Sequence, residues 1–308
     1  MLDSVGSCEY NGLPRTGRAF PGRLALAGAL LAAMGGAWLT GICGVSDAAA
    51  QAMPGGVGLG TALRSEAGWG GCLALLVNPA GLAGSDPCLR LQVSRLHGIP
   101  GLTDSHVAWQ GRWKGRKLAL GYGSAFQMVG WRSYKELSAS PGVGLSVGGT
   151  HLGIAGRMEH MQFAPGMPAY RTVSATFGVR QPLGKQIQAG FTLWRMLDLR
   201  LEDGGGLARV EPSRFQLAAG AAWHPDPSVR FFAELHGQPG YPAGIAMGGA
   251  VRLAEVVALE LAMGHAPDWA SGGVRLVRER VSVEWMGRWH PELGLTQAVG
   301  LVLAGGRR

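Results

Sequence analysis

The sequence predicts an all-β fold, specifically a transmembrane antiparallel β-barrel of about 14 strands. Three observations predict it. Apolar residues alternate with polar or very small ones over most of the chain, an export signal precedes them, and no later apolar run is long enough for a membrane helix. The composition agrees, because 47% hydrophobic and 16% charged residues exclude a disordered chain and a coiled coil. The 52 glycines lack the every-third spacing of collagen.

The N-terminus has the order of a secretory signal. Three arginines between residues 15 and 23 precede an uncharged apolar run at 24–45, and a small-residue cleavage pattern surrounds Ala50. We therefore predict a signal peptide over residues 1–50, cleaved near Ala50, and export of the rest of the chain. A retained N-terminal anchor is the alternative, because the run is long enough to cross a bilayer.

The basic balance of the chain does not predict a nucleic-acid partner. Its 28 basic and 20 acidic residues give a formal net charge of +8. The basic residues are scattered, without a Lys/Arg cluster and interleaved aromatics. We predict no nucleic acid among its partners.

Residues 88–308 carry the alternation and form the predicted barrel. In the first strand, Leu89, Leu91 and Val93 alternate with Arg90, Gln92 and Ser94, and no helical period competes. The same period of two recurs at 107–113, 118–123, 173–179, 187–193, 215–223, 229–235, 257–263, 281–285 and 299–303.

Strand count and closure follow from spacing and membrane physics. Strands of about ten residues fit this region about fourteen times, with connections of roughly six residues. Closure is required, because an open sheet edge in hydrocarbon leaves backbone groups unpaired. A soluble β-sandwich is the alternative, since its strands also alternate.

Tryptophans on the apolar face favour the membrane barrel. Trp109 and Trp113 are four residues apart, as are Trp285 and Trp289. At the usual strand tilt, one member of each pair can lie in an aromatic girdle while the other reaches into the apolar band. In a sandwich these tryptophans would be core residues.

The opposite face mixes charged residues, glutamine and glycine, as in the lumen wall of a barrel. We expect ion pairs on this face, with no bulky apolar lining. The residues predicted to face the lumen are Arg90, Arg112, Lys117, Gln186, Gln188, Arg230, Glu234, Arg252, Glu260, Glu284 and Arg288.

Before the barrel, the Gly/Ala-rich segment 51–87 contains the one distinctive motif, which consists of Asn78, Pro79, Ala80, Gly81, Leu82 and Ala83. It suits a chain corner, because Pro fixes φ, the preceding Asn bonds its own backbone, and Ala-Gly permits close approach to a wall. An ordinary helix-start turn is the alternative.

This motif, followed by an alternating β domain, resembles the FadL-type long-chain fatty-acid transporters and the related PorV/PorQ-type outer-membrane proteins. The segment 290–297 also resembles the final hairpin of the PorV-like group. The resemblance implies that residues 51–87 form a hatch inside a fourteen-stranded barrel. Two features depart from the pattern: leucines stand at 73, 75 and 76 where acidic residues are common, and the last strand lacks a terminal aromatic residue.

Cys72 and Cys88 remain after removal of the signal, in an oxidising compartment. We predict a disulfide between them that ties the hatch to the first strand. Two free buried thiols are the alternative.

We predict that the protein is not an enzyme and carries no cofactor or metal. The histidines lack metal-ligand spacing, and neither a phosphate loop nor a nucleophile elbow is present. The FadL resemblance implies passage of a hydrophobic small molecule across the bacterial outer membrane. The PorV resemblance implies a structural or secretion-associated protein with another envelope protein as partner, and a simple aqueous pore is a third possibility. In each case, outer-membrane lipid surrounds the barrel.

Overall fold

The structure is a computed structural model that describes residues 72–305, except 116–117, 132–133, 164–165, 168, 202–206, 211–214 and 267. The predicted signal peptide, the first part of the predicted hatch (51–71) and Lys117 lie outside the described residues. Among the helices of these described ranges, none is long and apolar enough to cross a membrane.

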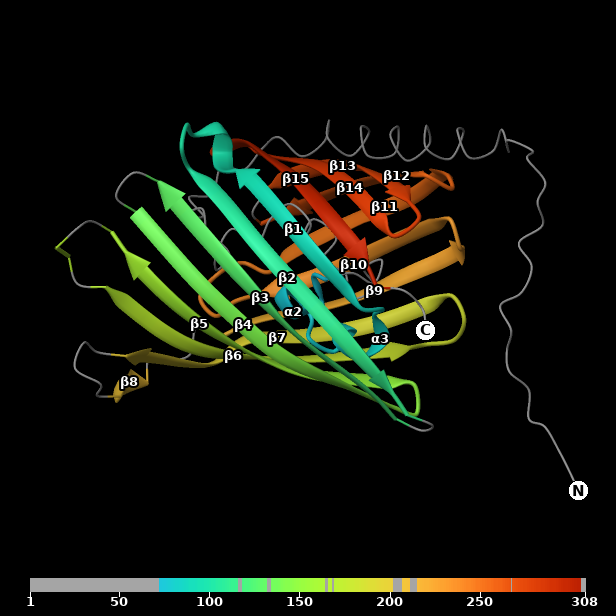
Figure 1. The fold of residues 1–308 in the computed structure, drawn as a ribbon, viewed down its shortest axis with the longest axis horizontal. Helices are drawn as coiled ribbons and strands as arrows, with labels where there is room; N and C mark the ends of the chain where they lie inside the picture. The colour runs from blue at the N-terminus through green and yellow to red at the C-terminus, as the bar shows by residue number, and fades with distance from the viewer. Residues whose placement is uncertain are drawn as a thin grey trace, which may run out of the picture. The chain divides into compact units, whose positions relative to one another are not determined.

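The described chain forms a closed antiparallel ring of strands (Figure 1). The sheet has 15 strands, of which β8 pairs only with β7, so 14 form the wall. Pairing of β1 with β15 and of β6 with β7 completes the ring, which confirms the predicted barrel and its strand number. The elements are α2 (Ala74–Val77), α3 (Gly81–Gly84), β1 (Cys88–Arg95), η2 (Leu96–Gly98), β2 (Thr103–Lys114), β3 (Leu118–Trp131), β4 (Tyr134–Val147), β5 (Thr150–Gln162), β6 (Tyr170–Pro182), β7 (Ile187–Leu201), β8 (Leu207–Val210), β9 (Gln216–Asp226), β10 (Val229–Gly237), β11 (Gly244–Ala254), β12 (Val257–His265), β13 (Trp269–Arg278), β14 (Val281–His290) and β15 (Gly294–Ala304).

The two ends of the barrel differ in their connections. Where β1 begins and β15 ends, the strands are joined by short turns, which we call the turn end: 115–117, 148–149, 183–186, 227–228, 255–256 and 279–280. The opposite, loop end carries four longer connections, 96–102, 163–169, 202–215 and 238–243, besides the short ones at 132–133, 266–268 and 291–293. In bacterial barrels, short turns face the periplasm and long loops face outward, so this asymmetry orients the barrel.

The wall is taller on one side. Strands β2 to β7 have 12 to 15 residues, whereas β9 to β15 have 9 to 11. Figure 1 shows this taller half, with β8 beside the loop end of β7, at the lower left. The barrel interior is therefore deeper beside β2 to β7.

The outer face of the wall is apolar and exposed, as required for contact with lipid. Large side chains predicted to face outward, such as Val93 and Val299, are 58% and 56% exposed. Trp109, Trp113, Trp285 and Trp289 are also exposed on this face. Trp113 stands next to the turn end of β2 and Trp289 next to the loop end of β14, so these tryptophans lie near both ends of the wall.

Candidate functional site: the barrel interior

Residues 72–87, which we call the inner segment, pack against the inner face of β2 to β5. The segment packs on a row of four glycines that stand directly opposite one another on neighbouring strands. They are Gly121 on β3, Gly144 on β4, Gly153 on β5 and Gly178 on β6. A Cβ atom at any of these positions would collide with the Asn78–Ala83 motif. The glycine row is therefore a trough in the wall that fits the backbone of the motif.

Asn78 fastens the motif to two strands at once. Its Nδ2 donates hydrogen bonds to the carbonyl oxygens of Val179 on β6 and Phe191 on β7, at 3.1 and 3.2 Å. Its Oδ1 accepts one from the Ala80 N–H at 2.9 Å. Asn78 is 3% exposed, and its amide uses both donor and acceptor. The side chain thus makes the local backbone contact expected at this motif, just before α3 begins at Gly81, and it also bridges β6 and β7.

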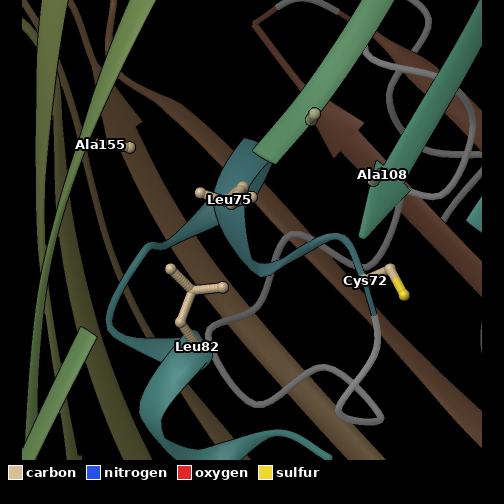
Figure 2. Packing of buried hydrophobic residues seen from close by; sticks show 6 residues of the cluster. Cys72, Leu75, Leu82, Ala108 and Ala155 are labelled. Atoms are coloured by element: carbon tan, nitrogen blue, oxygen red, sulfur yellow. The ribbon is translucent and has the colours of Figure 1, made fainter. Parts of the chain in front are cut away.

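A second contact is apolar (Figure 2). The Leu75 side chain from α2 lies over Gly123 and Gly142, which face each other on β3 and β4. Leu75 and Leu82 are buried with Cys72, Ala108 and Ala155 in one cluster. Leucine at position 75 therefore serves packing, where the resembling families often carry acidic residues.

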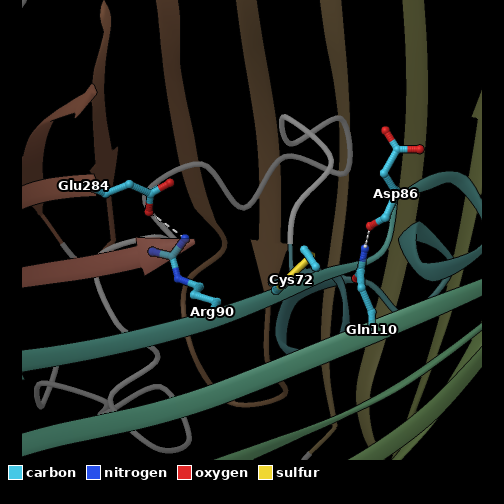
Figure 3. Close-up of a disulfide and its surroundings, with 6 residues drawn as sticks. Cys72, Asp86, Arg90, Gln110 and Glu284 are labelled. Carbon is cyan, nitrogen blue, oxygen red and sulfur yellow. Dashed lines mark hydrogen bonds and ion pairs between the residues drawn. A yellow bond between two sulfur atoms is a disulfide. The ribbon is translucent and has the colours of Figure 1, made fainter. Parts of the chain in front are cut away.

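The inner segment is also fastened at its ends (Figure 3). Cys72 and Cys88 form a disulfide across a sequence separation of 16. Near the start of β1, the Gln110 Nε2 donates a hydrogen bond to the Asp86 carbonyl oxygen at 2.7 Å. A covalent bond, side-chain hydrogen bonds and apolar packing thus hold this segment inside the barrel.

Ion pairs brace the opposite wall. Glu284 on β14 pairs with Arg90 on β1 at 2.6 Å and with Arg275 on β13 at 2.7 Å, and Arg275 reaches Glu260 on β12 at 3.5 Å. Figure 3 shows the Arg90–Glu284 pair. Both side chains of that pair are almost fully buried, so each charge depends on its partner. These contacts join four strands of the shorter half.

The same half carries an apolar patch that the sequence analysis did not anticipate. Phe232 on β10 and Trp269 on β13 lie on the inward face with three alanines, at positions 222, 246 and 262. The Phe232 ring occupies the space over Gly248 and the Trp269 ring the space over Gly264, so each ring lies where the neighbouring strand has no side chain. The guanidinium of Arg288 stacks over Trp269 at 4.3 Å. The interior therefore contains bulky apolar side chains as well as charges.

The predicted lumen residues fall into two groups. Gln186 lies exposed in the turn 183–186, where its Nε2 donates to the Pro225 carbonyl oxygen, and Arg252 is exposed beside a register irregularity near the end of β11. Gln186 stands just before β7 and Arg252 two residues before the end of β11, so both lie at the turn end, where their side chains reach solvent. The others within the described residues lie on the inward register, buried or half-buried: Arg90, Arg112, Gln188, Arg230, Glu234, Glu260, Glu284 and Arg288.

A second charged group, which we call the Glu159 cluster, was missed by the sequence analysis. It consists of Glu136, Arg157, Glu159, Arg195 and Asp198. Glu159 Oε1 pairs with Arg157 Nε at 2.6 Å and its Oε2 with Arg195 Nη2 at 3.4 Å. Glu136 adds a contact to Arg157 at 3.7 Å and Asp198 one to Arg195 at 3.2 Å.

The inward position of only some residues of this cluster could be predicted from the sequence. Arg157 and Glu159 alternate with outward Ile154 and Met158 around them, which is a period-two signal. On β7 the period breaks, because residues 194–196 stand opposite a single residue of β6 and Arg195 has a left-handed φ of 52°. This bulge brings Arg195 and Asp198 together although their spacing does not fit a regular strand.

A cavity of about 50 Å³ lies between the inner segment and the Glu159 cluster. Leu75 and Leu76 line it from the inner segment, and Trp194 and Gln216 from β7 and β9. Its polar wall is formed by Arg157, Glu159, Arg195, Ser140, Ser174 and Thr176. Most of these residues lie on the loop-end side of the motif, so the cavity is on that side of the inner segment. In the described part of the chain, no group of three or more His, Cys, Asp or Glu is placed to hold a metal ion.

Comparison with known proteins supports the fold. No protein-family model matches this sequence, and no curated protein matches it. Among solved structures, the CymD monoaromatic hydrocarbon channel matches with a TM-score of 0.53 and 10% sequence identity, over 77% of this chain and 94% of that chain. A mutant of the Rh. blastica porin matches less well, with a TM-score of 0.39 and 8% identity over 71% of this chain and 99% of that chain. The chain therefore has the fold of an outer-membrane β-barrel.

Proposed function

We propose that this chain is an outer-membrane transport barrel that admits a small, largely hydrophobic molecule from the loop end. The observation that carries the proposal is the cavity above the inner segment. Its floor is apolar, formed by Leu75 and Leu76, and Trp194 adds an aromatic wall. The apolar surface beside several polar groups suits a small amphipathic molecule, and the cavity of about 50 Å³ must widen to admit one.

The contacts of the inner segment argue against a permanently open aqueous pore. The disulfide, the Asn78 hydrogen bonds and the glycine row hold residues 72–87 against the wall inside the barrel. A water-filled porin instead needs an unobstructed lumen. Because this segment occupies part of the lumen, we infer that passage through the barrel involves a change of shape.

The wall offers a place for that change. The ladder between β7 and β9 ends at the pair Trp194 and Gln216, and both residues line the cavity. Beyond this pair, β7 turns to β8 instead of β9. A solute in the cavity is thus next to a point where the hydrogen bonds between β7 and β9 end. It leaves the barrel either through the wall at this point or past the inner segment.

The CymD monoaromatic hydrocarbon channel shares the barrel fold, since this chain covers 94% of that chain. The FadL-type resemblance of the motif agrees with it. At 10% identity, the likeness extends to the fold alone. The solute is therefore inferred from the cavity.

Uptake by intact Gram-negative cells that express the full chain tests the proposal. We expect faster initial uptake of labelled toluene than in cells without the chain, and no gain for labelled arabinose. Ser174→Phe, which fills the cavity, should abolish the gain. Ser124→Phe is the matched control, because Ser124 lies on the outward face of β3. Equal gains for both solutes would indicate an open pore, and a toluene gain unaffected by Ser174→Phe would reject the cavity as the route.

A second function, binding of another envelope protein, is favoured by one observation. The connection 163–169 presents Phe163 and Met167 to solvent at 50% and 58% exposure. Phe163 also packs with Tyr134 and Tyr170 at the loop end, with ring centroids 5.5 and 5.9 Å apart. Native mass spectrometry of the purified barrel distinguishes the two, since a stoichiometric protein partner lost in Phe163→Ser would favour this alternative.

A further inference from the structure

We propose that Glu159 determines the charge specificity of the cavity, so that it accepts uncharged amphipathic molecules and rejects carboxylates. The inference rests on the proposed function and names the substrate class of the same site. It is carried by how the two arginines of the cavity are paired. Arg157 and Arg195 both line the cavity, and cationic side chains in a pocket would ordinarily attract an anion.

Glu159 occupies the position that such an anion would take. Each of its two carboxylate oxygens pairs with a different arginine, Oε1 with Arg157 Nε at 2.6 Å and Oε2 with Arg195 Nη2 at 3.4 Å. The Glu159 side chain is 5% exposed, so these contacts are shielded from water and from screening by salt. A ligand carboxylate would therefore have to compete with a resident carboxylate for the same donors.

The remaining charges make this competition harder. Glu136 pairs with Arg157 and Asp198 with Arg195. Three carboxylates thus face two guanidinium groups, 2 − 3 = −1 in formal charge. An incoming anion meets a net negative cluster in a site of low dielectric, where like charges are costly.

The uncharged groups of the cavity suit a different ligand. Ser140, Ser174, Thr176 and Gln216 offer hydroxyl and amide groups for neutral hydrogen bonds. Leu75, Leu76 and Trp194 provide the apolar surface. This combination fits a small molecule with an apolar ring or chain and one hydroxyl group. Because the cavity measures about 50 Å³, a ring enters only when its wall yields.

Benzyl alcohol and benzoate are suitable probes, because they share a ring and carbon number and differ in charge. Binding of each probe to the purified full chain in detergent is measured by calorimetry. The heat that remains with Ser174→Phe comes from the detergent micelle and is subtracted, so that only binding in the cavity is counted. In the wild-type protein, we expect benzyl alcohol to bind about tenfold more tightly than benzoate.

Glu159→Gln should raise the affinity for benzoate about tenfold, because it releases two arginine donors, and leave that for benzyl alcohol nearly unchanged. Glu136→Gln is the matched control, because it removes the same charge from the cluster at a residue that does not line the cavity. In Glu159→Gln/Arg195→Gln, the gain for benzoate should fall again. Heat-dependent gel mobility verifies folding of each variant.

The possible results separate the two proposals. Equal binding of both probes by the wild-type protein, or an equal gain for benzoate in Glu136→Gln, would overturn the role of Glu159 and leave the transport function standing. Absence of any binding sensitive to Ser174→Phe would reject the cavity as a site and, with it, the proposed function. The wild-type comparison decides the charge preference even if Glu159→Gln does not fold.

Discussion

Asn78 occupies the space that a side chain at position 178 would need. A Cβ atom on Gly178 would collide with Asn78 Oδ1, and the Asn78 Nδ2 bonds the carbonyl oxygen of the next residue, Val179. The motif of the inner segment and the surface of β6 at Gly178 are therefore complementary in shape. This relationship explains part of the high glycine content, because the inner wall needs residues without side chains where the inner segment packs against it.

Gly178→Ala should displace the motif without preventing barrel formation. The new methyl group overlaps Asn78 Oδ1, and such overpacking costs about 1–3 kcal/mol. Limited proteolysis should then cleave the inner segment faster, while heat-dependent gel mobility still shows a folded barrel. Gly156→Ala is the control, because a Cβ atom there meets nothing within 4 Å. Equal protease resistance in the two variants would contradict the close fit.

Asn78→Asp tests the two hydrogen bonds to the wall. Aspartate keeps the acceptor for the Ala80 N–H but loses the Nδ2 donor to Val179 and Phe191. It also places carboxylate oxygens against two carbonyl oxygens, so we expect a loss of about 1–3 kcal/mol. Planar-bilayer recordings should show more frequent opening events than in the wild type. A conductance record identical to the wild type would mean that Asn78 does not hold the segment in place.

The disulfide should stabilise the protein through its unfolded state. Closing a loop with a sequence separation of 16 removes chain entropy worth about 3 kcal/mol. Cys72→Ser should therefore lower the unfolding temperature, and a reducing agent should lower that of the wild type but not of the variant. Mass measurement after alkylation provides the check. Two alkylatable thiols in the native wild-type protein would exclude the bond.

The loop-end connection 96–102 should open at acidic pH. Burial, and after it the charges of His290 and Arg288, lowers the pKa of His97 from its usual value of 6.5. The unfolded connection then binds a proton more readily than the folded one, so the stability that the neutral form provides is lost as pH falls below about 6.5. Hydrogen exchange of this peptide, corrected for intrinsic rates, should be faster at pH 5 than at pH 7.5. His97→Gln should remove the difference, and a wild-type peptide equally protected at both values would refute it.

Glu284→Gln should destabilise the shorter half of the wall. Glu284 is the shared partner of Arg90 and Arg275, and its loss leaves the buried Arg90 without its carboxylate partner. Removing one partner of a buried ion pair costs about 3–5 kcal/mol. Denaturant unfolding in detergent measures the change. An unfolding midpoint within error of the wild type would show that this pair does not brace the wall.

The sequence by itself determined the class of fold. The period-two alternation separates a lipid-facing from an interior-facing set of residues, and that separation is local, so it can be read from neighbours in the chain. The strand number, the outward tryptophans and the inward position of Arg90, Arg230, Glu234 and Glu284 followed from it. The Asn78 motif was recognisable for the same reason, because a turn is a local structure.

Only the tertiary structure decided which residues meet across strands. The glycine row exists because the register aligns Gly121, Gly144, Gly153 and Gly178, and register depends on pairing between segments far apart in the sequence. The bulge in β7 shifts the alternation and brings Arg195 to Glu159. Phe232 on β10 and Trp269 on β13 join one cluster through the alanines of the strands around them. Closure of the ring and this register, more than any single segment, built the cavity and its charges.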